Sequence, residues 1–383
     1  GSSERNISAI ISSADVGKAV NTLHEEFFSD GKKQINLYIT GVGTVGGKLI
    51  EQIRRQHEYL LENMRLNVRV VGLSNSKQMV FDEEGIDLDG WKEVLDQPSS
   101  TGGGETAAII IDKNLRNSIF VDVTASPEVV EMYPQLLKRS VSVIACNKIA
   151  CSSGYEQYLN LKNLAREFNT NFLFETNVGA GLPVINTLND LMRSGDSVNS
   201  IEAVLSGTLN FVFNNYDGSR KFAEVVRQAQ AEGYTEPDPR LDLSGTDVAR
   251  KILILAREAG YKMELSDIAN ESFLPKSCLN GSVEDFYVEM ERHEDHFRGL
   301  LENAIADGLT LKYIASFRNG KASVGLQSIG ADHNFANLSG KDNAVLFYTN
   351  RYSEQPLVIK GAGAGADVTA AGVFADIVRA SRT

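Results

Sequence analysis

A glycine-rich turn near the start of the chain constrains the fold more than any other feature of the sequence. Residues 35–40 form a short apolar run rich in β-forming residues, and Gly41, Gly43 and Gly46 follow it before a helical pattern that includes Leu49. Gly41 permits a tight turn, Gly43 lets backbone amides approach a pyrophosphate, and Gly46 allows close helix packing. The order of strand, glycine turn and helix predicts a Rossmann-type α/β domain that binds a dinucleotide. A purely structural glycine turn is the alternative.

The second predicted strand, residues 67–72, bears on the choice of cofactor. No carboxylate follows it, although an NAD-specific fold usually places Asp or Glu there, on the ribose 2′-hydroxyl. Ser76 and Lys77 suit a 2′-phosphate, so we expect NADP to be preferred, while NAD can enter without repulsion. Strands at residues 119–124 and 141–145 should also end beside the cofactor. The expected cofactor-binding residues are Gly41, Gly43, Thr44, Val45, Gly46, Ser76, Lys77, Thr124, Ala125, Ser126, Lys148 and Gly365.

The composition narrows the class of protein. With 383 residues, of which 42% are hydrophobic, the chain can bury a large core in two or three domains. The net charge of -12, without a basic run, argues against nucleic-acid binding. The three cysteines are too few and scattered for a disulfide framework, and no membrane-spanning apolar segment occurs in the sequence. We therefore expect a cytoplasmic protein that binds neither nucleic acid nor membrane.

Residues 233–251 bring Glu236, Asp242, Asp247 and Lys251 close to the start of a predicted helix. Asp247 and Lys251 stand four apart on one helical face, an arrangement that ordinary exposed ion pairs share. Glu236 and Asp242 lie on the preceding loop, which two prolines stiffen. Because several polar groups converge on one amine, the stretch is a candidate functional site.

Lys148 is a second candidate amine, because it follows the strand at residues 141–145. Cys146 and Cys151 flank it, which makes a thioester-forming dehydrogenase with a cysteine nucleophile the rival enzyme class. No histidine lies nearby in the sequence to activate such a thiol. A non-catalytic cofactor sensor is the alternative outside the enzymes.

Three further segments have a local pattern that suggests a site or a domain. Glu175 opens a glycine-containing loop whose carbonyl oxygens can bind a hard monovalent cation, although a plain β–α turn is the simpler interpretation of the residues alone. Residues 206–208 form a small polar turn able to contact a substrate. Alternating segments between residues 311 and 349 predict a second, α+β domain with an open sheet. The glycine-rich turn at 361–365 either packs tightly or returns to the cofactor.

Six motifs occur in the order found in homoserine dehydrogenases, and the chain resembles that family over nearly all of residues 34–383. The motifs are Gly41–Gly46, Asn147–Lys148, Glu175–Pro183, Ser206–Thr208, Gly233–Lys251 and Gly361–Gly372. Residues 73–77, Gly90–Trp91 and 373–378 make the chain most similar to the dehydrogenase half of bifunctional aspartate kinase-homoserine dehydrogenases. Residues 1–33 resemble the end of the kinase's ACT region, so we expect a fragment that lacks the kinase domain.

The resemblance implies NAD(P)-dependent, reversible interconversion of L-homoserine and L-aspartate 4-semialdehyde, on the route to threonine and methionine. The catalytic residues it implies are Lys251, Lys148 and Asp247, and the substrate-binding residues are Glu236, Asp242, Gly207 and Thr208. It leaves open which lysine donates the proton. It also implies a monovalent cation, such as sodium, at Glu175, Val178, Ala180 and Leu182.

The expected organisation has four parts. They are a residual ACT-region segment at 1–33, an NAD(P)-binding Rossmann domain at 34–174, a catalytic and dimerisation domain at 175–355, and a C-terminal segment at 356–383 that returns to the nucleotide domain. The resemblance, and the need of an open sheet for a partner, predict a homodimer.

Overall fold

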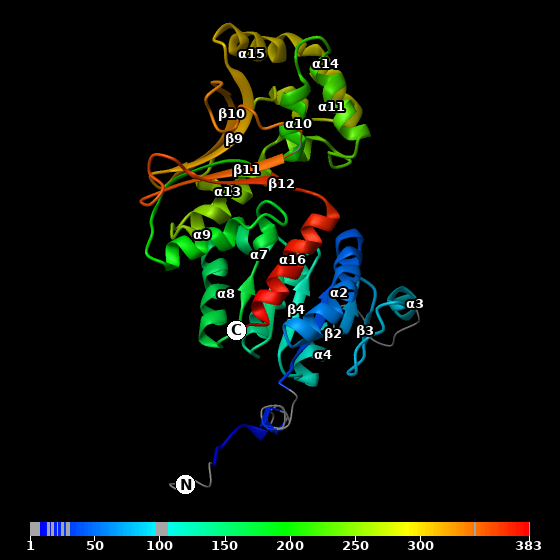
Figure 1. The fold of residues 1–383 in the computed structure, drawn as a ribbon. Coiled ribbons are helices and arrows are strands. Elements are labelled where there is room, and N and C mark those ends of the chain that lie inside the picture. The colour runs from blue at the N-terminus through cyan, green and yellow to red at the C-terminus, as the bar shows by residue number, and fades with distance from the viewer. Residues whose placement is uncertain are drawn as a thin grey trace. The chain divides into compact units, whose positions relative to one another are not determined.

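The chain divides into two compact units, which are drawn in Figure 1. The computed structural model describes residues 8–13, 16, 19–20, 22–23, 27, 31–96, 106–340 and 342–382. The first unit comprises Gly1–Ala145, Asn160–Leu173 and Phe374–Thr383, and the second comprises Cys146–Leu159 and Phe174–Val373. The segment that we expected to resemble an ACT region, residues 1–33, lies largely outside the described residues.

The first unit contains a six-stranded sheet with helices between its strands. Its elements are β1 (Lys33–Thr40), α2 (Thr44–Asn63), β2 (Leu66–Ser74), β3 (Met79–Phe81), α3 (Trp91–Asp96), α4 (Thr106–Lys113), β4 (Ser118–Asp122), α5 (Pro127–Val130), α6 (Tyr133–Leu137), β5 (Ser142–Ala145) and β6 (Phe172–Leu173). Helix α8 (Tyr155–Glu167) and helix α16 (Ala366–Ala380) each contribute residues to both units.

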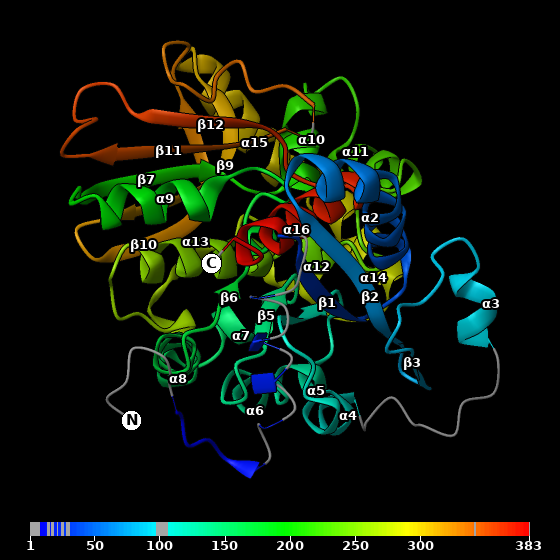
Figure 2. The same cartoon turned by 60° about the horizontal axis from the view of Figure 1, so that its bottom comes forward.

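The strand order of this sheet is β3-β2-β1-β4-β5-β6, and every pairing except β2 with β3 is parallel. All five residues of β4 are buried, as are the last six of β1, which is typical of parallel strands covered on both faces. Helix α2 packs against β2 (Figure 2). The predicted Rossmann-type fold is therefore confirmed, and the carboxyl ends of β1, β2 and β4 meet along one edge.

The second unit is an α+β domain. Its elements are α7 (Ile149–Ser152), a 3-10 helix η3 (Glu175–Asn177), α9 (Val184–Arg193), β7 (Val198–Val204), α10 (Gly207–Asn215), α11 (Phe222–Ala231), α12 (Arg240–Leu243), α13 (Thr246–Glu258), η4 (Leu265–Asp267), β8 (Ala269–Glu271), η5 (Lys276–Leu279), α14 (Val283–Arg292), α15 (Glu294–Ala306), β9 (Thr310–Arg318), β10 (Lys321–Ile329), β11 (Asp342–Thr349) and β12 (Leu357–Ala362).

Its sheet has the order β12-β11-β7-β9-β10-β8, and all pairings are antiparallel except the parallel pair of β10 with β8. Within this unit, α10, α11, α14 and α15 lie on one side of the sheet, and α9 and α13 on the other (Figure 1). The predicted open sheet is confirmed.

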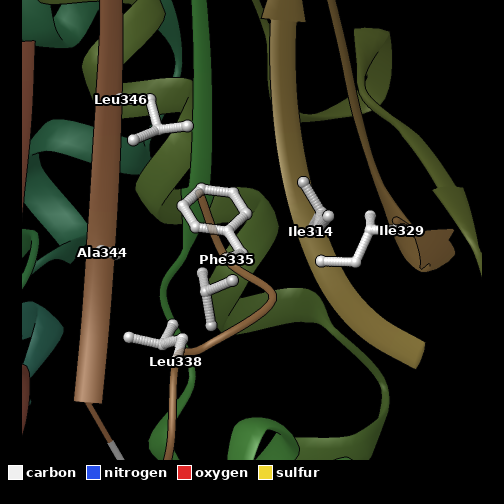
Figure 3. Close-up of a cluster of buried hydrophobic side chains, with 7 residues drawn as sticks. Ile314, Ile329, Phe335, Leu338, Ala344 and Leu346 are labelled. Carbon is white, nitrogen blue, oxygen red and sulfur yellow. The ribbon is translucent and has the colours of Figure 1, made fainter. Parts of the chain in front are cut away.

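The connection between β10 and β11 contributes to the core of the second unit. Phe335 and Leu338 of this connection are buried in one cluster with Ile314 of β9 and Leu346 of β11, and the Phe335 ring lies between Ile314 and Leu346 (Figure 3). The apolar contacts hold the connection on the sheet, because removing these side chains from water stabilises the packed arrangement.

No helix within the described residues is both long enough and apolar enough to span a bilayer. This agrees with the sequence, in which the apolar segments are short.

Candidate functional site

A cavity of roughly 810 Å³ opens at the carboxyl edge of the Rossmann sheet, where the glycine-rich turn lies. Its lining includes Gly41, Gly43, Ser76, Thr124, Ala125 and Ser126 from the predicted cofactor site, together with Thr40, Val42, Asn75, Glu128, Val129 and Met132. A second hollow, of roughly 690 Å³, continues from Val42 and Gly43 past Thr44 to Trp91. The first unit thus contains space of the size that a dinucleotide needs.

The three glycines have different physical roles. Gly41 has a φ of 94°, and a Cβ there would lie 2.7 Å from the Val123 carbonyl oxygen. A Cβ at Gly46 would lie 2.0 Å from the carbonyl oxygen of Gly41, so Gly46 lets α2 start against the turn. A Cβ at Gly43 would meet no atom of the described residues within 4 Å. Gly43 therefore borders open space, as a position that faces a ligand should.

The N-terminus of α2 is suited to hold phosphate. Its N-cap residue is Gly43, which has no side chain to cap the helix, and its first turn contains no acidic residue. Its first amide groups have no partner within the helix, and the helix dipole favours an anion there.

The tips of β2 and β4 are shaped by short side-chain hydrogen bonds. The Asn75 carboxamide oxygen accepts hydrogen bonds from the amides of Lys77, at 2.8 Å, and Gln78, at 3.0 Å. The buried Asp122 carboxylate accepts one from the amide of Thr124, at 2.7 Å, and one from the Tyr133 hydroxyl, at 2.6 Å. These bonds leave Ser76 and Lys77 exposed beside the cavity.

In the second unit, one carboxylate joins the two candidate lysines. Asp247 Oδ1 lies 3.3 Å from Lys148 Nζ, and Asp247 Oδ2 lies 2.8 Å from Lys251 Nζ. Asp247 and Lys251 are in the first turns of α13, whereas Lys148 directly precedes α7. The structure thus brings together the three predicted catalytic residues.

The two lysines have different surroundings. Lys251 also donates to the Leu205 carbonyl oxygen at 2.7 Å, and its side chain is only 11% exposed. The Lys148 side chain is 34% exposed. Leu205 directly precedes the Ser206–Thr208 turn, so Lys251 is held beside the predicted substrate-binding turn.

The pKa of Asp247 reflects this pairing. Partial burial by itself would raise the pKa of this carboxyl, but the ammonium groups of Lys251 and Lys148 outweigh burial and hold the pKa well below its usual range. Asp247 is therefore ionised at neutral pH, and it can keep two cations close together.

The predicted substrate loop is organised around Asp242. Its Oδ2 accepts a hydrogen bond from the Glu236 amide at 2.8 Å, and its Oδ1 lies 3.2 Å from the Thr208 hydroxyl, which also donates to the Tyr234 carbonyl. Both Asp242 oxygens are thus used within the loop, whereas the Glu236 side chain is exposed. Burial raises the pKa of Asp242 above its usual range, and repulsion from the Glu236 and Asp247 carboxylates adds to this effect. The hydrogen bonds from the Glu236 amide and the Thr208 hydroxyl lower the pKa and so oppose it.

The Glu175 carboxylate is hydrogen-bonded to the backbone at the start of α9. It accepts hydrogen bonds from the backbone amides of Ile185, at 2.6 Å, and Asn186, at 2.9 Å, and it caps the start of α9. Val178 and Ala180 are buried in the same loop, and Ala180 has a φ of 52°. No group of three or more His, Cys, Asp or Glu side chains suited to a metal is found in the described part of the chain. A cation here would be bound by main-chain oxygens.

Three other residues of the sequence-based interpretation lie in the second unit. Gly365 is exposed and has a φ of 118° at the start of α16. Cys151 is fully buried and Cys146 is partly buried. A fully buried thiol is poorly placed for the nucleophile of a thioester-forming enzyme.

Sequence reasoning missed several groups that organise these sites. The carbonyl oxygens of Leu205 and Tyr234 hold Lys251 and Thr208, but a backbone acceptor leaves no signal in the residue types. Asn75 could have been found, because Asn commonly accepts hydrogen bonds from amides two and three residues ahead.

Two family models match the chain. The model described as homoserine dehydrogenase matches residues 183–378, and the one described as the homoserine dehydrogenase NAD binding domain matches residues 41–175. The first covers most of the second unit, and the second covers most of the sheet of the first unit.

Among curated relatives, the chain is similar to bifunctional aspartokinase/homoserine dehydrogenase 2, chloroplastic, of Zea mays, with 41% identity over 99% of the chain and 42% of that protein. It is 40% identical to the bifunctional aspartokinase/homoserine dehydrogenase of Haemophilus influenzae, over 99% of the chain and 46% of that protein. The chain thus spans less than half the length of these relatives.

Solved structures have the same fold. A Candida auris protein of unknown function has a TM-score of 0.83 and 33% identity, over 92% of this chain and 99% of that one. A hyperthermophilic archaeal homoserine dehydrogenase in complex with NADPH has a TM-score of 0.71 and 25% identity, over 91% and 98%. Together with the matched residues 183–378, these similarities show that the chain belongs to the homoserine dehydrogenase family.

Proposed function

We propose that the chain catalyses the reversible NADP-dependent oxidation of L-homoserine to L-aspartate 4-semialdehyde, a step toward threonine and methionine. The observation that carries this proposal is the single carboxylate of Asp247 between the ammonium groups of Lys148 and Lys251. An enzyme that interconverts an alcohol and an aldehyde needs a group that moves a proton at the reacting oxygen. A lysine next to a carboxylate that stays ionised can do this.

We assign the binding of the substrate's amino-acid part to the loop and turn around Asp242. The exposed Glu236 carboxylate pairs with the substrate ammonium, and Asp242 holds the loop through the Glu236 amide. The amides of Gly207 and Thr208, in the first turn of α10, receive the substrate carboxylate, because the first amides of a helix lack internal partners.

The proton steps follow from these assignments. In the oxidation, one lysine amine accepts the hydroxyl proton of homoserine while the carbon-bound hydrogen leaves as a hydride. In the reduction, the lysine ammonium returns the proton to the aldehyde oxygen. Asp247 orients both lysines, and the Leu205 carbonyl oxygen accepts a hydrogen bond that further restricts the position of the Lys251 ammonium. The cofactor, when bound, supplies or accepts the hydride.

NADP is the cofactor that the residues at the tip of β2 fit best. Ser76 lines the cavity, Lys77 is exposed beside it, and no carboxylate follows β2 to repel a 2′-phosphate. The archaeal relative's complex with NADPH supports this assignment. Lys148 and Gly365 stay proposed cofactor-binding residues.

The remaining expectations also belong to this proposal. A monovalent cation such as sodium would bind main-chain oxygens of Glu175, Val178, Ala180 and Leu182, next to the cap of α9. The chain would act as a homodimer in the cytoplasm, as the dehydrogenase part of a longer protein with an aspartate kinase. The boundaries 34–174, 175–355 and 356–383 stay predictions for the functional domains.

The decisive experiment is homoserine-dependent formation of NADPH, followed at 340 nm, by the purified folded chain. We expect turnover in the wild type and a loss of about 10²- to 10⁴-fold for the lysine that moves the proton. Lys148→Ala and Lys251→Ala, each measured across pH, would identify that lysine. Tight NADP binding without turnover would instead support a cofactor sensor. Loss of activity in Cys146→Ser or Cys151→Ser, with the fold intact, would support the thioester mechanism.

A further inference from the structure

The last turn of α13 carries a buried arginine that lies away from the reacting groups. The Arg257 guanidinium is fully buried, and each of its three nitrogens donates a hydrogen bond. Nε donates to the Met263 carbonyl oxygen at 3.0 Å, Nη1 to the Cys151 carbonyl oxygen at 2.7 Å, and Nη2 to the Glu264 carboxylate at 3.1 Å. A buried guanidinium is retained only where such partners compensate for its lost hydration.

One of these bonds reaches the helix that follows Lys148. Cys151 is in α7, and the next residue, Ser152, donates through both its amide, at 2.9 Å, and its hydroxyl, at 2.8 Å, to the Lys148 carbonyl oxygen. Arg257 is therefore connected to the backbone of Lys148 through two hydrogen bonds, one to Cys151 and one from its neighbour Ser152 to the Lys148 carbonyl oxygen. Helices α7 and α13 also pack directly against one another.

Contacts around Arg257 also attach the start of α8 to the end of α13. The Glu264 carboxylate accepts a hydrogen bond from the Tyr155 amide at 3.0 Å while it pairs with Arg257. The Arg257 guanidinium also lies 5.7 Å from the Tyr155 ring centre and 5.3 Å from that of Tyr158, within the range of cation–π attraction. The adjacent Glu258 accepts from the Tyr158 hydroxyl and from Asn189 of α9. The end of α13 is thus fastened to α7, α8 and α9.

This arrangement matters because α13 carries Asp247 and Lys251 at its other end. The 3.3 Å separation of Asp247 and Lys148 depends on how α7 sits against α13, since the two residues belong to different elements. Lys251, in contrast, lies on the same helix as Asp247 and keeps its distance through the helix itself. The contact between Asp247 and Lys148 therefore depends on interactions outside α13 that keep α7 packed against this helix.

We propose that Arg257 is a positioning residue for Lys148: by holding the Cys151 carbonyl, it fixes α7 against α13 and keeps the Lys148 ammonium beside Asp247. This inference rests on the proposed function for its kinetic consequence, but the geometric link can be measured without turnover. Lysine cannot replace the arginine, because one ammonium cannot reach three acceptors that lie in different directions.

The test compares Arg257→Lys with Lys262→Met. Lys262 pairs with Glu156 at 2.8 Å and so also joins the region before η4 to α8, but both side chains of this pair are exposed. We expect Arg257→Lys to lower kcat about 10- to 100-fold, because small displacements of a catalytic group have effects of this size. Lys262→Met should stay within about twofold of the wild-type kcat, because an exposed ion pair contributes little.

A double-mutant cycle separates positioning from general destabilisation. In a Lys148→Ala background, Arg257→Lys should lower the residual kcat by less than about threefold, because residues that act through one another are not additive. An equal loss in both backgrounds, or no loss in either, would overturn the proposal. Circular dichroism and thermal unfolding of each variant identify any that fail to fold.

A second readout does not depend on activity. The rate at which acetic anhydride modifies Lys148, followed by peptide mass spectrometry, should rise several-fold in Arg257→Lys and stay unchanged in Lys262→Met. An unchanged rate in folded Arg257→Lys would contradict the role of Arg257. If the wild type lacked homoserine-dependent turnover, the proposed function would fail, while this rate would still decide whether Arg257 positions Lys148.

Discussion

The Lys148 ammonium lies 3.3 Å from the Asp247 carboxylate, although Lys148 precedes α7 and Asp247 lies in the first turn of α13. The same carboxylate lies 2.8 Å from Lys251 on its other oxygen. One negative charge therefore keeps together two positive charges that would otherwise repel one another.

Asp247→Asn should lower kcat with homoserine by about 10²-fold or more, because the amide keeps the shape of the side chain but not the charge that holds both lysines. Steady-state kinetics at neutral pH would measure this. Circular dichroism serves as the control and should show the secondary structure of the wild type. A variant with the wild-type kcat would contradict the role assigned to Asp247.

The same substitution should reveal how Asp247 contributes to stability. Since its folded pKa is depressed, its contribution is present above the ordinary carboxyl pKa of about 3.9 and is lost as the pH falls through the folded value. The Asp247 side chain is 46% exposed, so the gain is about 1 kcal/mol or less. Urea unfolding should show the wild type more stable than Asp247→Asn at pH 6, with the difference shrinking below pH 4.

Asp242→Asn should stabilise the folded protein at neutral pH, whereas Asp247→Asn should destabilise it. Burial raises the folded pKa of Asp242, so ionisation disfavours the fold, and stability is lost as the pH rises from the unfolded to the folded value. The amide oxygen can still accept from Glu236 N. We expect a gain of about 1 kcal/mol at pH 7 that disappears below pH 4, together with a raised KM for homoserine. A loss of stability at pH 7 would show that the charge is needed by the loop itself.

Gly245→Ala should destabilise the start of α13. Gly245 has a φ of 71°, and a Cβ there would lie 1.8 Å from the Tyr313 hydroxyl oxygen. The left-handed conformation and the overlap together should cost about 2–4 kcal/mol in urea unfolding. Tyr313→Phe in the same chain removes the overlapping oxygen and should restore part of this loss. Additive effects of the two substitutions would contradict the explanation.

Lys312→Met tests a buried ammonium in the second unit. Burial, with a smaller effect of Lys360, lowers the pKa of Lys312 to about 8. The folded state therefore disfavours the charged amine below this pH, and the penalty is relieved as the pH rises toward the unfolded value of about 10.4. The stability of the wild type relative to Lys312→Met should rise by up to about 3 kcal/mol between pH 8 and pH 10. A difference that does not vary with pH would rule out this titration.

Local patterns identified much of the fold before any tertiary structure. Gly41, Gly43 and Gly46 between an apolar strand and a helix predicted the Rossmann-type unit, and the strand order confirms it. The alternating segments between residues 311 and 349 predicted antiparallel strands: β9 pairs with β10, and β11 joins the same sheet through β7. These features are local, because strand periodicity and turn geometry depend on neighbouring residues.

The sequence by itself determined the residue types of the candidate site and the pairing of Asp247 with Lys251, because positions four apart on one helix must lie close together. It left Lys148 as a separate amine at a strand end. Only the tertiary structure decided that Lys148 shares the carboxylate of Asp247, that the Leu205 carbonyl holds Lys251, and that Glu175 caps α9. The first two contacts join segments far apart in the chain, and the last two use a backbone oxygen or backbone amides, groups that nearly every residue possesses. Residue types and spacing cannot report contacts that depend on how helices and strands pack.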